Sequence, residues 1–312
     1  MSALAVVNPR SAAGRTGKDW PQLETKLREI FPTMRSIATS ARGDATGLVR
    51  KALRAGVAEI IAVGGDGTIN EAMNGFFEHG EAIAPDAVFS FITSGTGGDF
   101  RKSFGISAGP HSGLAHLQHA PVRAIDIGRV TCVSAEGGTN VRHFINIASA
   151  GVSGEIVDTV NRSLILRRFG GRIAFALSSA GAFLTYRGRK VRLRIDGEVD
   201  TIATISTLVV ANGQFFGGGM RVAPRAKLDD GLFDVLVMEA VSGRRALADM
   251  GQIYKGTHLD NPSVRALRAS KVLAAPVAET RGLPIRIEVD GEVAGQLPAT
   301  FEILSSALKV RA

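Results

Sequence analysis

The residues best suited to chemistry lie in a glycine-rich turn. Residues 62–71 read Ala-Val-Gly-Gly-Asp-Gly-Thr-Ile-Asn-Glu, between an apolar run and a segment with helical spacing. A strand, a glycine turn and a helix in this order expose backbone N–H groups at the positive end of the helix, where phosphate oxygens bind. A carboxylate at Asp66 would repel phosphate directly, so it indicates a bridging cation or a proton-handling role. The turn therefore predicts a metal-dependent nucleotide site.

A second turn of the same kind follows along the chain. Residues 88–104 contain Thr-Ser-Gly-Thr-Gly-Gly-Asp-Phe between a strand-like run and a helix-like run. Two such turns in one domain could hold a nucleotide from two sides, with Thr68 and Thr96 donating hydroxyl hydrogen bonds. A purely local role stays open, because Thr68 and Glu71 have the spacing of a capping box and Asp99 could cap its own helix. Neither turn fits the Walker A pattern or the dinucleotide fingerprint.

The elements that must position these turns change character near residue 125. Strand-like and helix-like runs alternate before it, so we predict an α/β domain over residues 1–125 with a parallel sheet flanked by helices. Ligands of such a sheet bind beyond the carboxyl ends of its strands. Strand-like runs dominate residues 126–312 and predict a mostly antiparallel β-sandwich, or a barrel, whose C-terminal tail could return to the first domain. Helical insertions are expected at 172–185 and 243–255.

Composition narrows the class of protein. No apolar run among the 312 residues reaches the ~20 residues of a membrane span, and the first residues lack the pattern of a signal peptide. The single cysteine, Cys132, excludes an internal disulfide and suits a reducing cytosol. The net charge of +8 favours an anionic partner. With one Trp, two Tyr and no reader motif, nucleic acid is not the expected partner. We therefore expect a cytoplasmic protein.

Several motifs together resemble a known family. They are Asn8-Pro9 with Ser11 and Gly14, the Gly-Gly-Asp-Gly-Thr of 64–68, the Gly-Thr-Gly-Gly-Asp-Phe of 95–100, Asn212-Gly213, the glycines 217–219, Ala223-Pro224, residues 228–235 and Asp290-Gly291-Glu292. This order resembles the diacylglycerol kinase catalytic family, which includes bacterial lipid kinases, sphingosine kinases and ceramide kinases. One position departs from it, since Gly98 stands where that family usually carries Asn.

The resemblance implies ATP-dependent phosphorylation of a lipid hydroxyl with the help of Mg²⁺. It places magnesium on Asp230 and on the main-chain carbonyls of Lys227 and Leu232, although Asp229-Asp230-Gly231 could equally be a simple turn. The implied nucleotide contacts are Asn8, Thr39, Gly64, Gly65, Asp66, Gly67, Thr68, Asn70, Gly95 and Thr96.

The implied catalytic residues are Asp66 and Glu292, with Glu292 as the general base. However, the chain contains two Asp-Gly-Glu tripeptides, at 196–198 and at 290–292, each after a strand-like run. An Asp-Gly pair between strands is a hairpin signal by itself. Spacing alone does not separate them, and only the late position in the family's order favours Glu292.

The sequence leaves open which molecule accepts the phosphate and whether the protein contacts a membrane. Residues 164–194 combine apolar runs with arginines and could contact an anionic membrane surface, or could be a packed helix with a solvated basic rim. Diacylglycerol, ceramide and sphingoid bases all offer a primary hydroxyl. Another phosphotransferase, such as an NAD kinase, and a non-enzymatic lipid- or nucleotide-binding regulator are the alternatives. Dimers are common in this family, so a homodimer is a further expectation.

Overall fold

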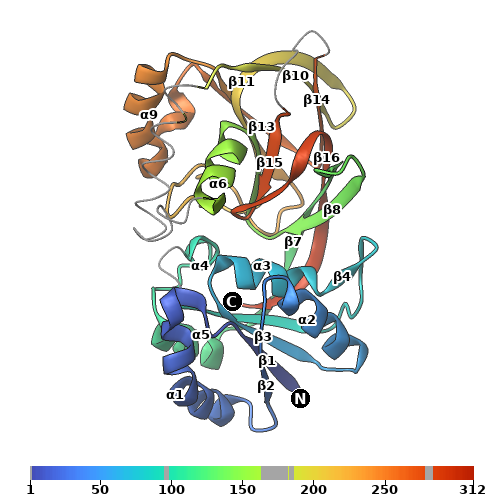
Figure 1. Cartoon of the computed structure of the whole chain (residues 1–312), viewed down its shortest axis with the longest axis vertical. Coiled ribbons are helices and arrows are strands. Elements are labelled where there is room, and N and C mark those ends of the chain that lie inside the picture. The colour runs from blue at the N-terminus through green and yellow to red at the C-terminus, as the bar shows by residue number, and fades with distance from the viewer. Residues whose placement is uncertain (1, 95–97, 163–181, 183–185, 278–283) are drawn as a thin grey trace. The chain divides into compact units, whose positions relative to one another are not determined.

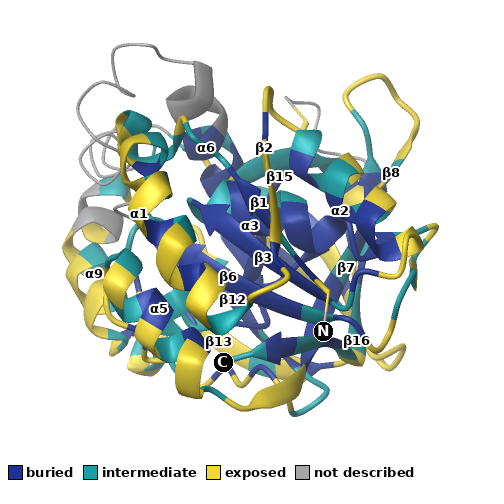
Figure 2. Ribbon diagram, turned by 90° about the horizontal axis from the view of Figure 1, so that it is seen from below, coloured by how far each residue is buried: buried dark blue, intermediate teal, exposed yellow. Residues whose placement is uncertain are grey.

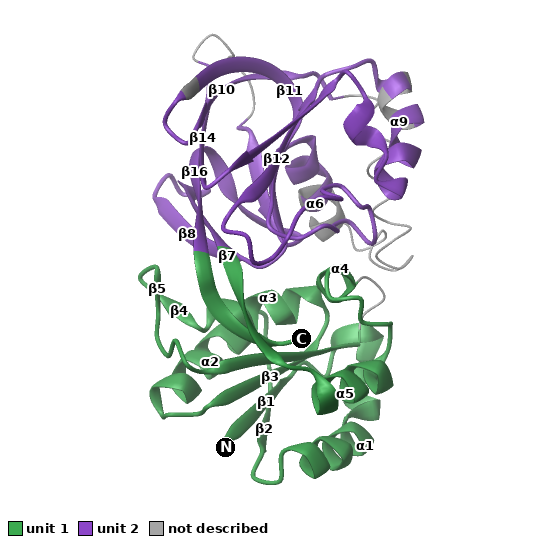
Figure 3. Ribbon diagram, turned by 180° about the vertical axis from the view of Figure 1, so that it is seen from behind, with its two compact units in different colours: residues 1–127, 305–312 green, residues 128–304 purple. Residues whose placement is uncertain are grey.

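The chain forms two compact units. The computed structural model describes residues 2–94, 98–162, 182, 186–277 and 284–312. Unit 1 contains Met1–Ile127 together with Ser305–Ala312, and unit 2 contains Gly128–Leu304 (Figure 3). The change of character predicted near residue 125 lies beside this boundary. The last strand carries the C-terminal tail into unit 1.

Unit 1 is built on a parallel sheet in the order β2–β1–β3–β6, extended beyond β6 by the end of β16. The central strands β1 and β3 are buried whereas the edge strand β2 is exposed (Figure 2). Parallel strands covered by helices on both faces have continuous apolar runs, as this sequence has. The strands are β1 (Ala3–Val7), β2 (Arg35–Ala38), β3 (Glu59–Gly64), β6 (Val88–Thr93), β16 (Glu292–Arg311) and the short pair β4 (Phe77–Glu78) and β5 (Glu81–Ala82).

Helices cover the two faces of this sheet. α1 and α5 pack on one face through Leu23, Leu27, Leu114 and Leu117, and α2 and α3 lie on the other (Figure 1). The helix α2 buries one stripe of residues with helical spacing, which explains why the sequence predicts it. The elements are the 3₁₀ turn η1 (Ser11–Gly14), α1 (Arg15–Ile30), α2 (Asp44–Arg54), α3 (Asp66–Asn74), α4 (Asp99–Lys102) and α5 (Pro110–His119).

Unit 2 is rich in antiparallel strands, as predicted, and its pairings favour the barrel over the sandwich. From β11 the pairings run through β10, β14, β16, β15 and β9 back to β11, which is a barrel-like closure. The reason is the length of β11 and β16, each of which pairs with different strands along its course. Its strands are β7 (Val122–Val133), β8 (Thr139–Phe144), β9 (Ile147–Gly151), β10 (Arg189–Ile195), β11 (Val199–Ala211), β12 (Phe233–Glu239), β13 (Val264–Ala269), β14 (Lys271–Pro276) and β15 (Arg286–Val289).

The described helices of unit 2 are α6 (Val152–Arg162), α9 (Gly243–Lys255) and the 3₁₀ turn η2 (His258–Asp260). The predicted helix at 243–255 is thus confirmed. The insertion predicted at 172–185 lies outside the described residues, apart from Ala182. Within the described ranges, no helix has both the length and the apolar character that a membrane crossing requires.

Candidate active site

The Gly-Gly-Asp-Gly-Thr segment joins the end of β3 to the start of α3. Gly65 is the N-cap, and the helix begins at Asp66, so Gly67 and Thr68 lie in its first turn. The capping-box spacing of Thr68 and Glu71 alone would place the N-cap at Thr68 instead. The first four N–H groups of a helix have no partner within that helix, and the dipole there favours anions. This turn therefore presents the kind of backbone that suits a phosphate group, and phosphate binding there stays a prediction.

Gly64 is fixed by close packing. A Cβ atom at this position would lie 2.6 Å from Thr68 Oγ1 and 2.7 Å from Thr68 Cβ. The Nδ2 of Asn8 donates a hydrogen bond to Thr68 Oγ1 over 2.9 Å, which holds that side chain in place. Three of the predicted nucleotide contacts are therefore interlocked.

We expect Gly64→Ala to destabilise unit 1 by roughly 1–3 kcal/mol, because the new methyl group overpacks against Thr68. ATP binding should weaken in parallel, since the first turn of α3 must move. Urea denaturation and calorimetric titration with ATP measure the two effects. Gly65→Ala is the matched control, because Gly65 has φ of −87° and a Cβ atom added there would meet nothing within 4 Å. Equal destabilisation in both variants would contradict this interpretation.

The other predicted nucleotide contacts of unit 1 gather at the same edge of the sheet. Backbone hydrogen bonds join Asn8 to Val63 over 2.9 Å, Thr39 to Val7 over 2.8 Å, and Ser94 to Gly64 over 2.9 Å. The loops after β1, β2 and β6 thus leave the sheet beside the turn after β3. Asn70 is buried within α3, where its side-chain oxygen accepts a bond from Asn74. Gly95 and Thr96 lie outside the described residues.

Asp66 faces the loop after β6. Its Oδ2 accepts a hydrogen bond from the Asp99 N–H over 3.3 Å, so the two glycine turns are directly linked. Asp99 itself pairs with Lys102 over 2.6 Å. Gly98, the departure from the family pattern, has φ of 56° and ψ of 47°. Asn and Gly are the residues that adopt this left-handed conformation most readily, so the replacement keeps the backbone geometry.

A hydroxyl cluster that the sequence reasoning missed fixes the loop after β1. Thr16 Oγ1 lies 2.5 Å from Ser11 Oγ and 2.5 Å from Ser94 Oγ. Between Ser11 and Thr16 the chain turns through left-handed residues, Ala12 with φ of 52° and Ala13 with φ of 56°. Ser11 belonged to the quoted Asn-Pro motif, but only the fold brings Ser94 to it.

In unit 2, both Asp-Gly-Glu tripeptides form hairpin turns of the same shape. Asp196 and Asp290 share φ of 47°, and each is followed by a glycine with positive φ. Each aspartate also accepts backbone N–H bonds from a neighbouring segment. Asp290 holds the amides of residues 145–147 at 2.9 to 3.1 Å, and Asp196 holds those of residues 270 and 271 at 3.0 and 2.8 Å. Both aspartates are therefore structural.

The two glutamates differ in their surroundings. Glu198 is exposed. Glu292 is partly buried, with 19% of its side chain accessible, and pairs with Arg142 across 3.5 Å. The Arg142 guanidinium orients this carboxylate, and a general base must be held in a fixed position. The sequence did not indicate Arg142, because its position on β8 gives no signal that it meets residue 292.

Glu288 is a second carboxylate at this turn that the sequence did not single out. It is 1% exposed, and its Oε1 lies 2.7 Å from Ser149 Oγ while its Oε2 accepts the Gly291 N–H over 2.9 Å. Burial raises its pKa from 4.5 to about 7, Ser149 and Gly291 oppose this, and the charge of Asp290 adds to it. Alternation along β15 would place Glu288 on a solvent face. That face is covered by α6, which packs against β15.

The raised pKa of Glu288 makes stability depend on pH. Because the pKa in the folded state lies above 4.5, this group stabilises the fold fully below about pH 4.5 and loses that contribution as pH rises to about 7. Glu288→Gln, which stays neutral, should therefore be more stable than the wild type by roughly 2–3 kcal/mol at alkaline pH and about equal at pH 4. Urea denaturation across this range measures it. An alkaline difference of zero would contradict the burial of an ionised carboxylate.

The predicted magnesium residues lie in the loop before β12. Asp230 Oδ1 accepts the Leu232 N–H over 3.3 Å, and Oδ2 pairs with Arg268. The pKa of Asp234 is raised mainly by burial, and its Oδ2 has no hydrogen-bond partner in the described part of the chain. Carboxylate and carbonyl oxygens suit a hard cation, so the donor set fits Mg²⁺, with Arg268 as a competing cation. The described ranges hold no cluster of three acidic, His or Cys ligands, so a magnesium ion held here would also need main-chain carbonyls such as that of Lys227.

Hydrogen bonds connect this loop to the Asp290 turn. Asn146, held by Asp290, accepts the N–H groups of Asn212 and Gly213 at 2.9 and 2.7 Å. Gln214 then donates to the carbonyl of Ala226 over 3.1 Å, one residue before Lys227. The late family motifs of unit 2 thus belong to one hydrogen-bonded network, although they are far apart in sequence.

Comparisons with known proteins find relatives of both parts of the chain. The model of the diacylglycerol kinase catalytic domain matches residues 2–130, and that of the YegS C-terminal NAD kinase beta sandwich-like domain matches residues 146–312. A protein of Staphylococcus carnosus named diacylglycerol kinase is 28% identical, covering 99% of this chain and 94% of its own. A "Probable lipid kinase YegS-like" of Chromohalobacter salexigens is 31% identical, covering 72% of this chain and 68% of its own.

Solved structures share the fold. A diacylglycerol kinase of Bacillus anthracis superposes with a TM-score of 0.70 at 20% identity, covering 99% of this chain and 96% of its own. An NAD kinase of Archaeoglobus fulgidus in complex with ATP reaches a TM-score of 0.51 at 14% identity, covering 100% of this chain and 94% of its own. Because the family models together span both units, the chain belongs to the diacylglycerol kinase catalytic-domain family of lipid kinases.

Proposed function

We propose that this enzyme transfers the γ-phosphate of ATP to the primary hydroxyl of a membrane lipid. The observation that carries the proposal is the interlocked turn of Gly64, Asp66 and Thr68 at the start of α3, in a chain of this family. Phosphoryl transfer depends mostly on positioning and charge neutralisation, and a helix N-terminus supplies both for a nucleotide phosphate. Glu292, paired with Arg142, takes the proton of the acceptor hydroxyl.

Magnesium has a defined role in this proposal. Asp230 and the carbonyls of Lys227 and Leu232 would hold it, with Asp234 beside them. When bound, the ion supplies positive charge that neutralises neighbouring oxygens. The side chains themselves order the loop, because Asp230 ties Leu232 to Arg268.

Unit 2 also has a small apolar cavity of about 30 Å³ between α6, α9 and the strands β11 and β12, and it would have to widen to admit an alkyl chain. Methionines adapt their shape more readily than branched side chains, so such a lining could adjust to an alkyl chain. Its lining residues are Ser153, Ile156, Thr207, Val209, Phe216, Met220, Val222, Met238, Met250 and Ile253.

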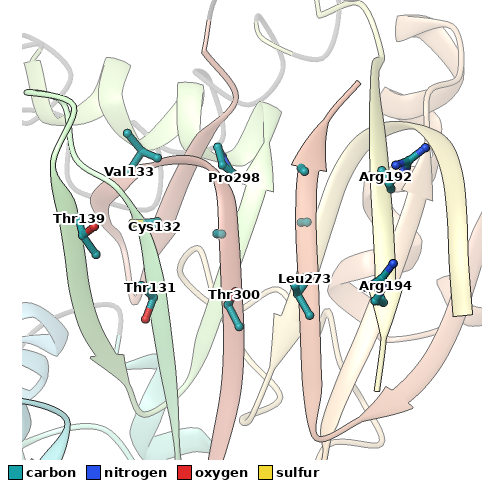
Figure 4. A pocket seen from close by; sticks show the side chains of 12 residues that line it. Thr131, Cys132, Val133, Thr139, Arg192, Arg194, Leu273, Pro298 and Thr300 are labelled. Carbon is teal, nitrogen blue, oxygen red and sulfur yellow. The ribbon is translucent and has the colours of Figure 1, made fainter. Parts of the chain in front are cut away.

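Contact with an anionic membrane on the cytoplasmic side belongs to the same proposal. The predicted segment 164–194 is described only at its end, where β10 presents Arg192 and Arg194 to solvent (Figure 4). They line a groove of about 370 Å³ that also includes Leu273 and Thr300. Basic side chains at a membrane surface contribute about 1 kcal/mol each. Sedimentation with anionic and neutral vesicles at low and high salt tests this contact.

The decisive experiment is an assay with radiolabelled ATP over a panel of acceptors. Diacylglycerol, ceramide and a sphingoid base are compared with NAD, and the products are separated by chromatography. We expect labelled lipid and no labelled NAD, with the product lost in Asp66→Ala. Transfer of phosphate to NAD alone would indicate an NAD kinase in place of a lipid kinase. ATP consumption that does not depend on any acceptor would refute a lipid kinase.

A further inference from the structure

A buried chain of polar groups ends at the Asp290–Glu292 turn. Ser153, in the first turn of α6, lies 2.7 Å from Ser149 Oγ, and Ser149 Oγ lies 2.7 Å from Glu288 Oε1. The other carboxyl oxygen of Glu288 accepts the Gly291 N–H. All three side chains are at most 4% exposed. The chain thus reaches from a helix terminus to the residue before Glu292.

The number of hydrogens in this chain sets its direction. Ser149 has one hydroxyl hydrogen and two acceptors within reach, Glu288 Oε1 and Ser153 Oγ, so it donates to only one of them at a time. When Glu288 is ionised, Ser149 donates to Glu288. When Glu288 carries a proton on Oε1, Ser149 accepts that proton and donates its own to Ser153. Only the ionised form offers a full negative charge to the Gly291 N–H.

We propose that Glu288 is the positioning residue of the proposed base: its carboxylate, anchored by Ser149, holds the Gly291 N–H and so fixes the backbone from which Glu292 extends. The inference rests on the proposed role of Glu292. It adds a residue that acts through the turn rather than on the substrate.

The ionised state of Glu288 holds the Gly291 N–H more strongly than the neutral state does. Hydrogen bonds to a charged acceptor are shorter and about twice as strong as neutral ones. The nearby positive end of α6 favours this anion, whereas burial and Asp290 oppose it, so both states occur near neutral pH. The charged groups on the turn and on the elements around Glu288 are Asp290, Glu292, Arg142 on β8, Glu155 on α6 and Arg286 on β15.

The kinetic consequence is a rise in kcat over the pH range in which Glu288 ionises. We expect kcat of the wild type to increase roughly three- to tenfold as Glu288 ionises around pH 7. Glu288→Gln keeps an oxygen for the Gly291 N–H but stays neutral, so its kcat should remain at the lower level and lose this rise. A purely structural Glu288 would leave the shape of the pH profile unchanged.

Two serine variants separate positioning from folding. Ser149→Ala removes the hydroxyl donor to the ionised carboxylate, so the rise in kcat should move upward by roughly one pH unit. Ser153→Ala is the matched control, because Ser149 can still donate to Glu288 and the rise should move much less. Equal displacement in both variants, or none in either, would overturn the proposal.

A measurement independent of activity completes the test. The amide NMR signal of Gly291 should titrate between about pH 6 and 9 in the wild type and stay fixed in Glu288→Gln. If the wild type phosphorylates no lipid, the proposed function fails and the amide titration alone decides the link between Glu288 and the turn. An amide signal that does not titrate in the wild type, or titrates equally in the variant, would refute the link.

Discussion

Glu292→Gln is expected to lower kcat for lipid phosphorylation by roughly 10²–10⁴-fold while ATP binding persists. Glutamine has nearly the same shape as glutamate but cannot accept the proton of the acceptor hydroxyl. The loss should appear in kcat rather than in the affinity for ATP, because the proposed nucleotide contacts belong to unit 1 and this residue belongs to unit 2. Initial rates with radiolabelled ATP and calorimetric titration with ATP measure the two quantities.

The chain supplies its own control for this prediction. Glu198→Gln changes the same residue in the same tripeptide, in a turn of the same shape, but at an exposed position. It should leave the rate within about twofold, since surface substitutions away from special contacts usually cost under about 0.5 kcal/mol. A Glu292→Gln enzyme with near-normal rates would remove the general base from our account. A large loss in Glu198→Gln would show that the assignment chose the wrong tripeptide.

Arg311→Ala should cost roughly 3–5 kcal/mol of folding free energy. The Arg311 guanidinium donates hydrogen bonds to both carboxylate oxygens of Glu59, over 2.8 and 2.7 Å, and Glu59 is only 2% exposed. Ser90 adds a hydrogen bond to Glu59 over 2.6 Å. Removal of the arginine leaves an unpaired charge inside the parallel sheet, because Ser90 alone cannot neutralise it. Urea denaturation gives the difference directly.

Two comparisons test the cause of that loss. Lys309→Ala removes the neighbouring pair with Asp86, which is 2.8 Å long but has Asp86 98% exposed, so it should cost under about 1 kcal/mol. The double variant Arg311→Met with Glu59→Met removes both charges and should recover most of the lost stability. If the double variant is no more stable than Arg311→Ala, the cost comes from lost packing and not from the unpaired buried charge of Glu59.

The local elements of unit 1 were well predicted, for a simple reason. In the parallel sheet, burial on both faces makes each strand a continuous apolar run, and each amphipathic helix has one buried stripe. Glycine turns can be recognised in the sequence because only glycine fits at such positions. At Gly64, for example, any Cβ atom would clash with Thr68. The helix at 243–255 in unit 2 was also confirmed. All of these patterns are local, because the residues that form each one lie within a few positions of one another in the chain.

The sequence did not decide between a sandwich and a barrel for unit 2. It shows that β11 and β16 are extended, but not that each pairs with different neighbours along its length, which produces the barrel-like closure. Pairing is decided by contacts between segments that are far apart in the chain, and these leave no local pattern.

The sequence by itself determined which turns could bind phosphate and which tripeptides could carry a base. It left the two Asp-Gly-Glu turns equivalent, because Asp196 and Asp290 obey the same local rules and have the same φ of 47°. The tertiary structure distinguishes the two turns, because it places Arg142 beside Glu292 and leaves Glu198 exposed. It also buried Glu288 under α6, against the alternation of its own strand. Charge and burial are properties of a neighbourhood, and distant segments of the chain create that neighbourhood only when they fold together.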